Sequence, residues 1–186
     1  MKEVVRCGWA NKDSEREYHD NEWGVPSHDD SYMFEMLILE GFQAGLSWIT
    51  ILNKRENFRK AFDNFDYNKI KDYKQDKIDE LLKNDGIIKN KLKVNSTVDN
   101  AKAFIKVQEE FGSFDKYISG FVNNKQIVNK WKDTKDLPAK TELSDKISKD
   151  MKKRGFKFVG STIIYSYLQA VGIIDDHITT CSFKKK

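Results

Sequence analysis

Glu40 is the residue whose type and position carry the clearest chemical signal in this sequence. It lies in the run 33–41, which has helical spacing, and it falls on the same face as Met36 and Leu37. A carboxylate that faces an apolar layer is costly unless a partner satisfies it. Trp48 follows eight residues later, and an acid beside aromatic rings indicates a pocket for a flat, electron-poor or cationic ligand. Two plainer roles stay open here: accepting hydrogen bonds from a nearby helix start, or reaching solvent near the helix end.

Cysteine and histidine occur near both ends of the chain. Cys7 and His19 lie near the start, and His177 and Cys181 lie four residues apart near the end. A His-x-x-x-Cys pair on a helical turn can place both side chains on one metal ion, and two cysteines with two histidines suit tetrahedral zinc. A fully filled set would make that zinc structural, with no open position for water. The spacing alone leaves incidental residues as an alternative, and His28 is a weaker candidate than His19.

Two helices joined by a short, glycine-bearing connection are predicted for the last third of the chain. The helices cover 144–154 and 161–171, and the connection contains Gly155 and Gly160. Glycine lets backbone N–H groups approach a phosphate, and helix starts add a favourable dipole. Basic side chains surround the connection, namely Lys152, Lys153, Arg154 and Lys157. The pattern predicts a helix-hairpin-helix unit over 144–172 that contacts DNA phosphates, with an ordinary hairpin bearing solvated lysines as the alternative.

The elements that must position these residues are expected to be helices. In a chain of 186 residues with only two prolines, apolar residues recur every three or four positions, which favours an all-α domain over a β-sandwich. Further helices are expected near 14–22, near 30–41, after Ser47, from Asp76 to Gly86, and over roughly 90–111. The stretch 120–140 is polar and poorly periodic, so we expect it to be mostly irregular.

Charge and composition limit the possible partners and location. The net charge of +4 permits nucleic acid as a partner without requiring it. No stretch is long and apolar enough to span a membrane, and the first residues lack the apolar stretch of a signal peptide, so a cytoplasmic protein is expected. A disulfide between the two cysteines is not expected in that reducing compartment.

Five stretches, in order and spread over nearly the whole chain, match one known family: 6–9, 18–26, 39–48, 153–160 and 176–177. With them the chain resembles the DNA-3-methyladenine glycosylase I family, the constitutive bacterial 3-methyladenine glycosylases. The segment 85–91 also resembles the wider helix-hairpin-helix glycosylase superfamily. The resemblance implies an all-α helix-hairpin-helix glycosylase fold in one compact unit, 1–186, with a central helical part, 25–140.

The family's activity and metal are implied in the same way. Members flip 3-methyladenine out of alkylated double-stranded DNA and release it as the free base by hydrolysis, without strand cleavage, in base excision repair. Their structural Zn²⁺ would tie the terminal segments 1–24 and 172–186 together, and its ligands fall here on Cys7, His19, His177 and Cys181. A monomer is expected.

The resemblance also assigns site residues. The base-binding pocket falls on Glu40 together with Tyr18, Trp48, Trp9 and Trp23. DNA-backbone contacts fall on Lys153, Arg154, Gly155, Lys157, Gly160 and Lys89. Methylation at N3 gives adenine a positive charge and weakens its glycosidic bond, so the base leaves neutral and needs no strong general acid. We therefore expect Glu40 to recognise the lesion electrostatically and not to expel it as an acid.

One position departs from the family pattern, and three rival functions stay open. Asp175 stands where family members can carry Asn and where many other helix-hairpin-helix glycosylases carry a catalytic Asp, so its role is open, though we expect it not to be catalytic. The rivals are a non-enzymatic DNA-binding module, a zinc-dependent hydrolase, and a glycosylase whose range includes 3-methylguanine.

Overall fold

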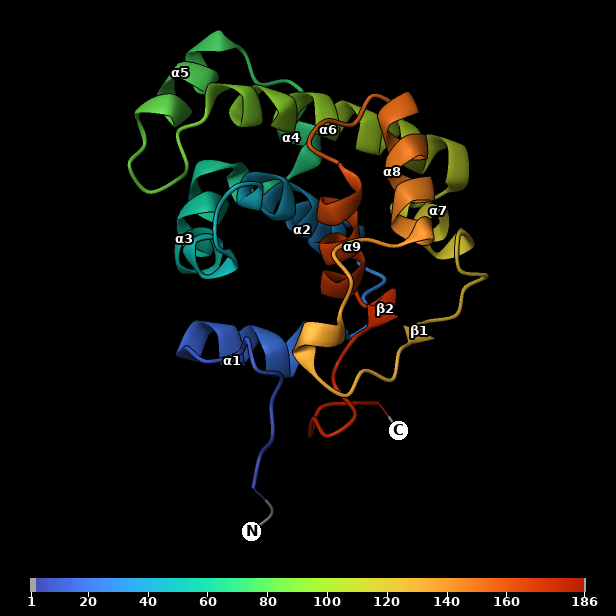
Figure 1. Cartoon of the computed structure of the whole chain (residues 1–186). Helices are drawn as coiled ribbons and strands as arrows, with labels where there is room; N and C mark the ends of the chain where they lie inside the picture. Colours follow the sequence, from blue (N-terminus) through green and yellow to red (C-terminus); the bar gives the residue numbers. More distant parts are fainter. Residues whose placement is uncertain (1–2, 186) are drawn as a thin grey trace.

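The computed structural model describes residues 3–185. Met1, Lys2 and Lys186, which belong to the terminal segments 1–24 and 172–186 of the zinc prediction, lie outside the described residues. The helices and strands follow one another in this order: α1 (Asp13–Asn21), α2 (Asp30–Gln43), α3 (Trp48–Ala61), η1 (Asp63–Phe65), α4 (Tyr67–Ile70), α5 (Gln75–Lys83), α6 (Lys91–Phe111), α7 (Phe114–Gly120), β1 (Ile127–Val128), η2 (Thr134–Asp136), α8 (Glu142–Lys153), α9 (Ser161–Ala170) and β2 (Ile174–Asp175) (Figure 1). The all-α prediction is confirmed, apart from one short parallel pair between β1 and β2.

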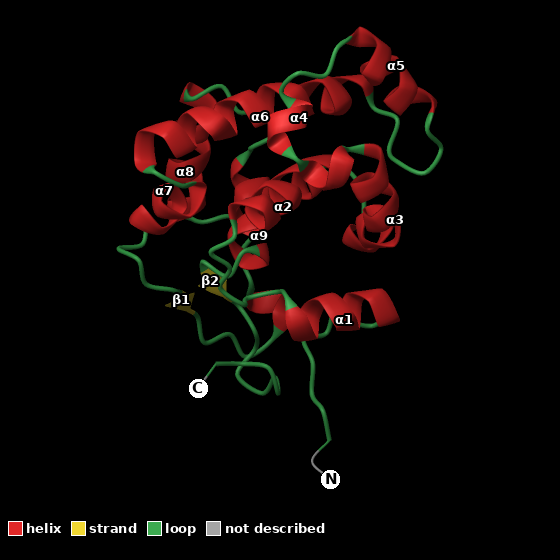
Figure 2. Cartoon of the chain, turned by 180° about the vertical axis from the view of Figure 1, so that it is seen from behind, coloured by secondary structure: helices red, strands yellow, loops and turns green. Residues whose placement is uncertain are grey.

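Helix α2 is the centre of the core. Every residue from Met33 to Phe42 is buried, because α3, α6, α7 and α9 all pack around this helix. A helix that is apolar on nearly all sides needs such a surrounding, and Glu40 is one of its few charged positions. Figures 1 and 2 show α6 and α1 on opposite sides of the α2–α9 centre.

The predicted helical hairpin is confirmed as α8 and α9, which pack against each other. Thr141 caps α8 through a capping box with Ser144, so the helix begins at Glu142, two residues before the expected start at 144. Gly155 follows α8 with φ +94°, a left-handed conformation that favours glycine. The connection therefore turns sharply at Gly155, and α9 begins directly after Gly160.

The structure corrects several predicted boundaries. The helix expected to start at an Asp76 cap instead has Lys74 at its N-cap. Helices α4 and α7 form where none was predicted, because they are too short to show a period in the sequence. Ser113 caps α7 by accepting from the backbone N–H of Lys116, and buried Phe114 and Ile118 anchor it.

The segments near the two ends of the described chain meet at Val5 and Ser182, below α1 and β2 in Figure 1. The backbone N–H of Ser182 donates to the Val5 carbonyl oxygen at 2.8 Å, and the Val5 N–H donates to Ser182 Oγ at 2.9 Å. Lys184, in the lysine tail, donates from Nζ to the carbonyl oxygen of Asp175. Within residues 3–185, the structure has no helix of the length and hydropathy needed to cross a membrane.

Candidate base-binding pocket and metal cluster

A cavity of about 250 Å³ brings the predicted pocket residues together. Glu40 comes from α2, Tyr18 from α1 and Trp48 from the first turn of α3. Its wall includes all five residues predicted for base binding, and further residues from other parts of the chain: Trp9, Tyr18, Trp23, Glu40 and Trp48, with Glu15, Gln43, Leu137, Ser166 and Gln169. Segments far apart in the sequence thus converge on one aromatic cavity that holds a carboxyl group.

Glu40 neither accepts hydrogen bonds from a nearby helix start nor reaches into bulk solvent. Its side chain is only 4% exposed, and no hydrogen bond or ion pair to it exists within residues 3–185. With no compensating partner, burial raises the pKa of Glu40 from 4.5 to about 8. An acid that is buried beside a cavity, perturbed and unpartnered is typical of a functional site.

The aromatic rings of the pocket are tilted against one another and do not stack face to face. The centroids of Tyr18 and Trp48 lie 5.3 Å apart with the planes at 57°, and those of Trp9 and Trp23 lie 5.1 Å apart at 77°. The buried Nε1 of Trp48 also has no partner in the described chain. Buried donors without a partner are rare, so Trp48, like Glu40, has an unmet hydrogen-bonding capacity in the pocket wall.

Three of the four predicted metal ligands form one buried cluster. The ligand atoms of Cys7, His19 and Cys181 all lie within 4.8 Å of one another. Cys181 Sγ is 3.6 Å from His19 Nε2, and a sulfur and a nitrogen on one tetrahedral zinc are about 3.5 Å apart. His19 Nδ1 lies 2.8 Å from Asp20 Oδ1, which leaves Nε2 directed to the sulfurs. The donor types and spacing therefore fit zinc.

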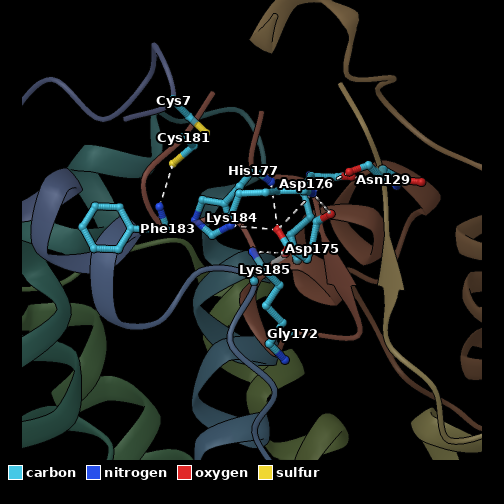
Figure 3. Close-up of polar contacts among 12 residues, drawn as sticks. Cys7, Asn129, Gly172, Asp175, Asp176, His177, Cys181, Phe183, Lys184 and Lys185 are labelled. Carbon is cyan, nitrogen blue, oxygen red and sulfur yellow. Dashed lines mark hydrogen bonds and ion pairs between the residues drawn. The ribbon is translucent and has the colours of Figure 1, made fainter. Parts of the chain in front are cut away.

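The fourth predicted ligand, His177, lies beside this cluster but outside the three-residue group. Its ring centroid is 4.7 Å from that of His19, and its Nε2 is 3.5 Å from the His19 carbonyl oxygen. His177 Nδ1 is 2.8 Å from Asp175 Oδ1, so its Nε2 is the nitrogen left for a metal (Figure 3).

Asp175 belongs to the metal cluster's surroundings and not to the base pocket. Its Oδ1 also accepts the backbone N–H of His177 at 3.0 Å, and Lys184 Nζ lies 3.7 Å away. These donors and the His177 ring lower the pKa of Asp175 against the opposing effect of burial. It does not line the cavity. These contacts suit a role in orienting His177, and the expectation that Asp175 is not catalytic stays a prediction.

The hairpin presents some of the predicted DNA-contacting residues freely. Lys153, Gly155 and Lys157 are exposed, and the space beside Gly160 is open. Buried Phe156 and Val159 anchor the connection beneath them. This arrangement leaves the backbone and lysines of the connection available to a phosphate.

Two other predicted DNA contacts are already paired within the protein. Arg154 donates to Glu110 Oε2 at 2.6 Å and to Asp150 Oδ2 at 2.7 Å, and it lies over the ring of Phe111. Its guanidinium thereby fastens α8 to α6. Lys89 pairs with Asp85.

The sequence reasoning missed the residues of α6 that hold this arrangement. Lys93 is 7% exposed, and its Nζ donates to the carbonyl oxygens of Phe42 at 2.8 Å and Ala44 at 2.7 Å. Asn100, two turns further on, binds the main chain of Lys157. The available signal was a run of polar residues at helical spacing on a helix with a buried side.

Gln169 and Ser166 of α9 were also missed. Both line the cavity, three residues apart on one helix. The signal in the sequence was a pair of polar side chains, one turn apart, among the apolar and aromatic residues of the second half of the helix.

An all-helical fold with an aromatic cavity around an unpaired acid is consistent with an all-α DNA glycosylase. The family model of methyladenine glycosylases matches residues 9–185, and the chain belongs to this family. It is 44% identical over 179 residues to the DNA-3-methyladenine glycosylase 1 of Escherichia coli, covering 96% of each chain.

Solved structures agree with this assignment. A crystal structure of 3-methyladenine DNA glycosylase I matches with a TM-score of 0.93 and 43% identity, covering 97% of this chain and 100% of the other. A structure that describes 3-methyladenine recognition by the Staphylococcus aureus enzyme matches with a TM-score of 0.94 and 34% identity, covering 97% of each.

Proposed function

We propose that this protein excises 3-methyladenine from alkylated double-stranded DNA by hydrolysis, as a DNA repair glycosylase. Its family membership and its relatives' names support this function. The observation that carries it is the unpartnered Glu40 carboxyl in an aromatic cavity, which suits a flat cation.

A base inside a duplex is shielded, so the nucleotide must be flipped into the cavity. There the rings of Trp48 and Tyr18 contact the cationic base, and Glu40 accepts a hydrogen bond from its exocyclic amine. The free protein holds Glu40 largely protonated at neutral pH, because its pKa is about 8. The fixed positive charge of the methylated base favours the carboxylate, so the proton leaves as the lesion enters.

The cleavage step needs little from the protein. The N3-methylated base leaves neutral, and water attacks the sugar. Unmodified adenine lacks the charge, and its departure would require protonation. Selectivity thus combines the substrate's own reactivity with the electrostatics of the cavity.

Hydrolysis without strand cleavage has separate support. Among the described residues that line the cavity, none is a lysine, so no amine stands there to form a covalent intermediate with the sugar.

The connection between α8 and α9 supplies the proposed contacts to the DNA backbone. Lys153 and Lys157, with the backbone at Gly155 and Gly160, are placed to contact phosphates. Lys89, which pairs with Asp85 in the free protein, stays a proposed DNA contact, while Arg154 shapes the hairpin through its carboxylate pairs. The bound unit is proposed to be a monomer.

We further propose that Cys7, His19, Cys181 and His177 hold one structural Zn²⁺ that fastens the two ends of the chain together. Such an ion supplies cross-linking and no chemistry. The cluster residues are buried, and none of them lines the cavity, which counts against a zinc-dependent hydrolase.

The deciding experiment is chromatography of the bases released from DNA treated with a methylating agent. We expect free 3-methyladenine, together with strands that break only after later alkali treatment. A protein that binds this DNA but releases no base would instead be a binding module.

A further inference from the structure

Gln169 is the second buried polar group of the cavity wall, after Glu40. It is 8% exposed and projects from α9, and its side chain lines the cavity. Unlike the Glu40 carboxyl, its amide has a firm partner. Gln169 Nε2 donates to Asp176 Oδ2 at 2.7 Å.

Asp176 fixes which end of this amide faces away from the cavity. It is fully buried, and its carboxylate accepts from Asn129 Nδ2 and Trp131 Nε1, each at 2.7 Å, and from the Tyr165 hydroxyl. Figure 3 shows Asn129 beside it. With these donors present the group is a pure acceptor, so only the NH₂ end of Gln169 can face it.

The other end of the amide is therefore the end left for a ligand. Gln169 Oε1 receives no hydrogen bond from any residue in the range 3–185. An amide oxygen without a protein partner is open to a donor from a ligand, and the cavity is the space that this side chain lines.

A fixed acceptor distinguishes the two main classes of purine lesion. A 6-amino purine such as 3-methyladenine presents N–H donors, whereas a 6-oxo purine such as 3-methylguanine presents a carbonyl oxygen at the same position. Glu40 cannot make this distinction alone, because its carboxyl can accept when ionised and donate when protonated. Gln169 cannot adapt in this way, since turning its amide would bring Oε1 against the Asp176 carboxylate.

We propose that Gln169 is a specificity-determining residue that selects 6-amino over 6-oxo purine lesions, and that Asp176 is the positioning residue that fixes its amide. This inference rests on the proposed function. It addresses the lesion range, which family membership leaves open.

The test compares two products of one digest. Wild type and Gln169→Met are incubated with the same methylated DNA, and released 3-methyladenine and 3-methylguanine are quantified by chromatography. Methionine keeps the length of the side chain but removes the amide. The ratio of the two products does not depend on the fraction of enzyme that is folded.

We expect Gln169→Met to raise the ratio of 3-methylguanine to 3-methyladenine about fivefold or more, as the loss of one hydrogen bond predicts. Asp176→Asn should shift the ratio in the same direction, because an asparagine can donate to Oε1 and let the Gln169 NH₂ face the cavity. Asn129→Ala is the matched control. It removes a donor from the other oxygen of Asp176, and it should leave the ratio unchanged.

Binding of the two free bases, followed by tryptophan fluorescence, gives a second measurement. Gln169→Met should weaken 3-methyladenine binding and spare 3-methylguanine. Equal losses for both bases, or an unchanged product ratio, would overturn the inference. A wild-type protein that releases neither base would contradict the proposed function itself.

Discussion

Asn100 binds the main chain of Lys157 with both ends of its side-chain amide. The Lys157 N–H donates to Asn100 Oδ1 at 2.7 Å, and Asn100 Nδ2 donates to the Lys157 carbonyl oxygen at 3.1 Å. The next hairpin residue, Phe158, has φ +54° and packs beside Gly41, the neighbour of Glu40. Helix α6 thus links the connection between α8 and α9, which is proposed to bind DNA, to α2, the helix that carries Glu40.

Asn100→Leu should lower affinity for DNA without changing the number of phosphate contacts. The substitution removes two hydrogen bonds that fix the hairpin backbone, and a loss of about 3- to 30-fold is expected. Binding measured over a range of salt concentrations should give an unchanged slope of log affinity against log salt. Asn95→Leu, on the same helix but bonded only within it, is the control. Wild-type affinity in Asn100→Leu would show that the hairpin holds its shape unaided.

Lys157→Met should weaken binding to all DNA sequences alike and reduce the salt slope by about one, because it removes one phosphate-directed charge. Lys125→Met serves as control, since Lys125 lies next to β1, at the far end of α9 from the hairpin. An unaltered salt slope in Lys157→Met would argue against a phosphate contact at this position.

Glu40→Gln should fold normally and bind undamaged DNA like wild type, but excise 3-methyladenine about 10- to 100-fold more slowly. Glutamine keeps the shape and loses the charge that favours the cationic base, an interaction worth about 1.5–3 kcal/mol. Single-turnover kinetics on DNA that contains the lesion measure this loss. Glu15→Gln is the matched control, since Glu15 is a half-buried acid of the same cavity wall whose carboxylate already accepts from the backbone N–H groups of Asn11 and Lys12. Unchanged kinetics in a well-folded Glu40→Gln protein would remove Glu40 from the mechanism.

The same substitution should stabilise the protein at high pH. Burial raises the folded-state pKa of Glu40 from 4.5 to about 8, so the folded protein binds this proton more tightly than the unfolded chain. The stability that the folded protein gains from binding this proton is fully present below pH about 4.5 and is lost as the pH rises through about 8. At pH about 9, Glu40→Gln should therefore be more stable than wild type by on the order of a few kcal/mol, with little difference near pH 4.5. Urea unfolding at both pH values checks this, and equal stability at high pH would indicate a solvated carboxylate.

Metal analysis of the purified protein should find about one zinc per chain. Cys181→Ser should lose most of the metal and melt at a lower temperature, because the ion ties distant parts of the chain together. His177→Ala tests the fourth ligand, and His28→Ala is its control, since exposed His28 pairs with Asp115 instead. A stable, metal-free wild-type protein would refute the zinc site.

The sequence predicted most of what depends on local pattern or on family resemblance. The long helices, the hairpin and the residues around Glu40 all carry such signals, and the structure brings the five predicted pocket residues to one cavity. The sequence alone could not predict which partners the individual polar side chains bind. Arg154 belongs to a basic cluster in the sequence, but Glu110 and Asp150 engage it from two helices. Lys93 resembles a surface lysine in the sequence, but in the structure its Nζ binds the Phe42 carbonyl oxygen at the end of α2. These pairings depend on tertiary contacts that spacing does not encode.

The clustering of Cys7 with Cys181, from opposite ends of the sequence, has a consequence for biosynthesis. Cys7 precedes every helix described in residues 3–185, whereas Cys181 follows all of them and is therefore made only after they have been translated. A nascent chain that lacks Cys181 cannot complete the cluster, so the proposed zinc would be bound by the full cluster only after Cys181 has been made. Ribosomes that stall before Cys181 would therefore release chains without a closed cluster, which are open to degradation.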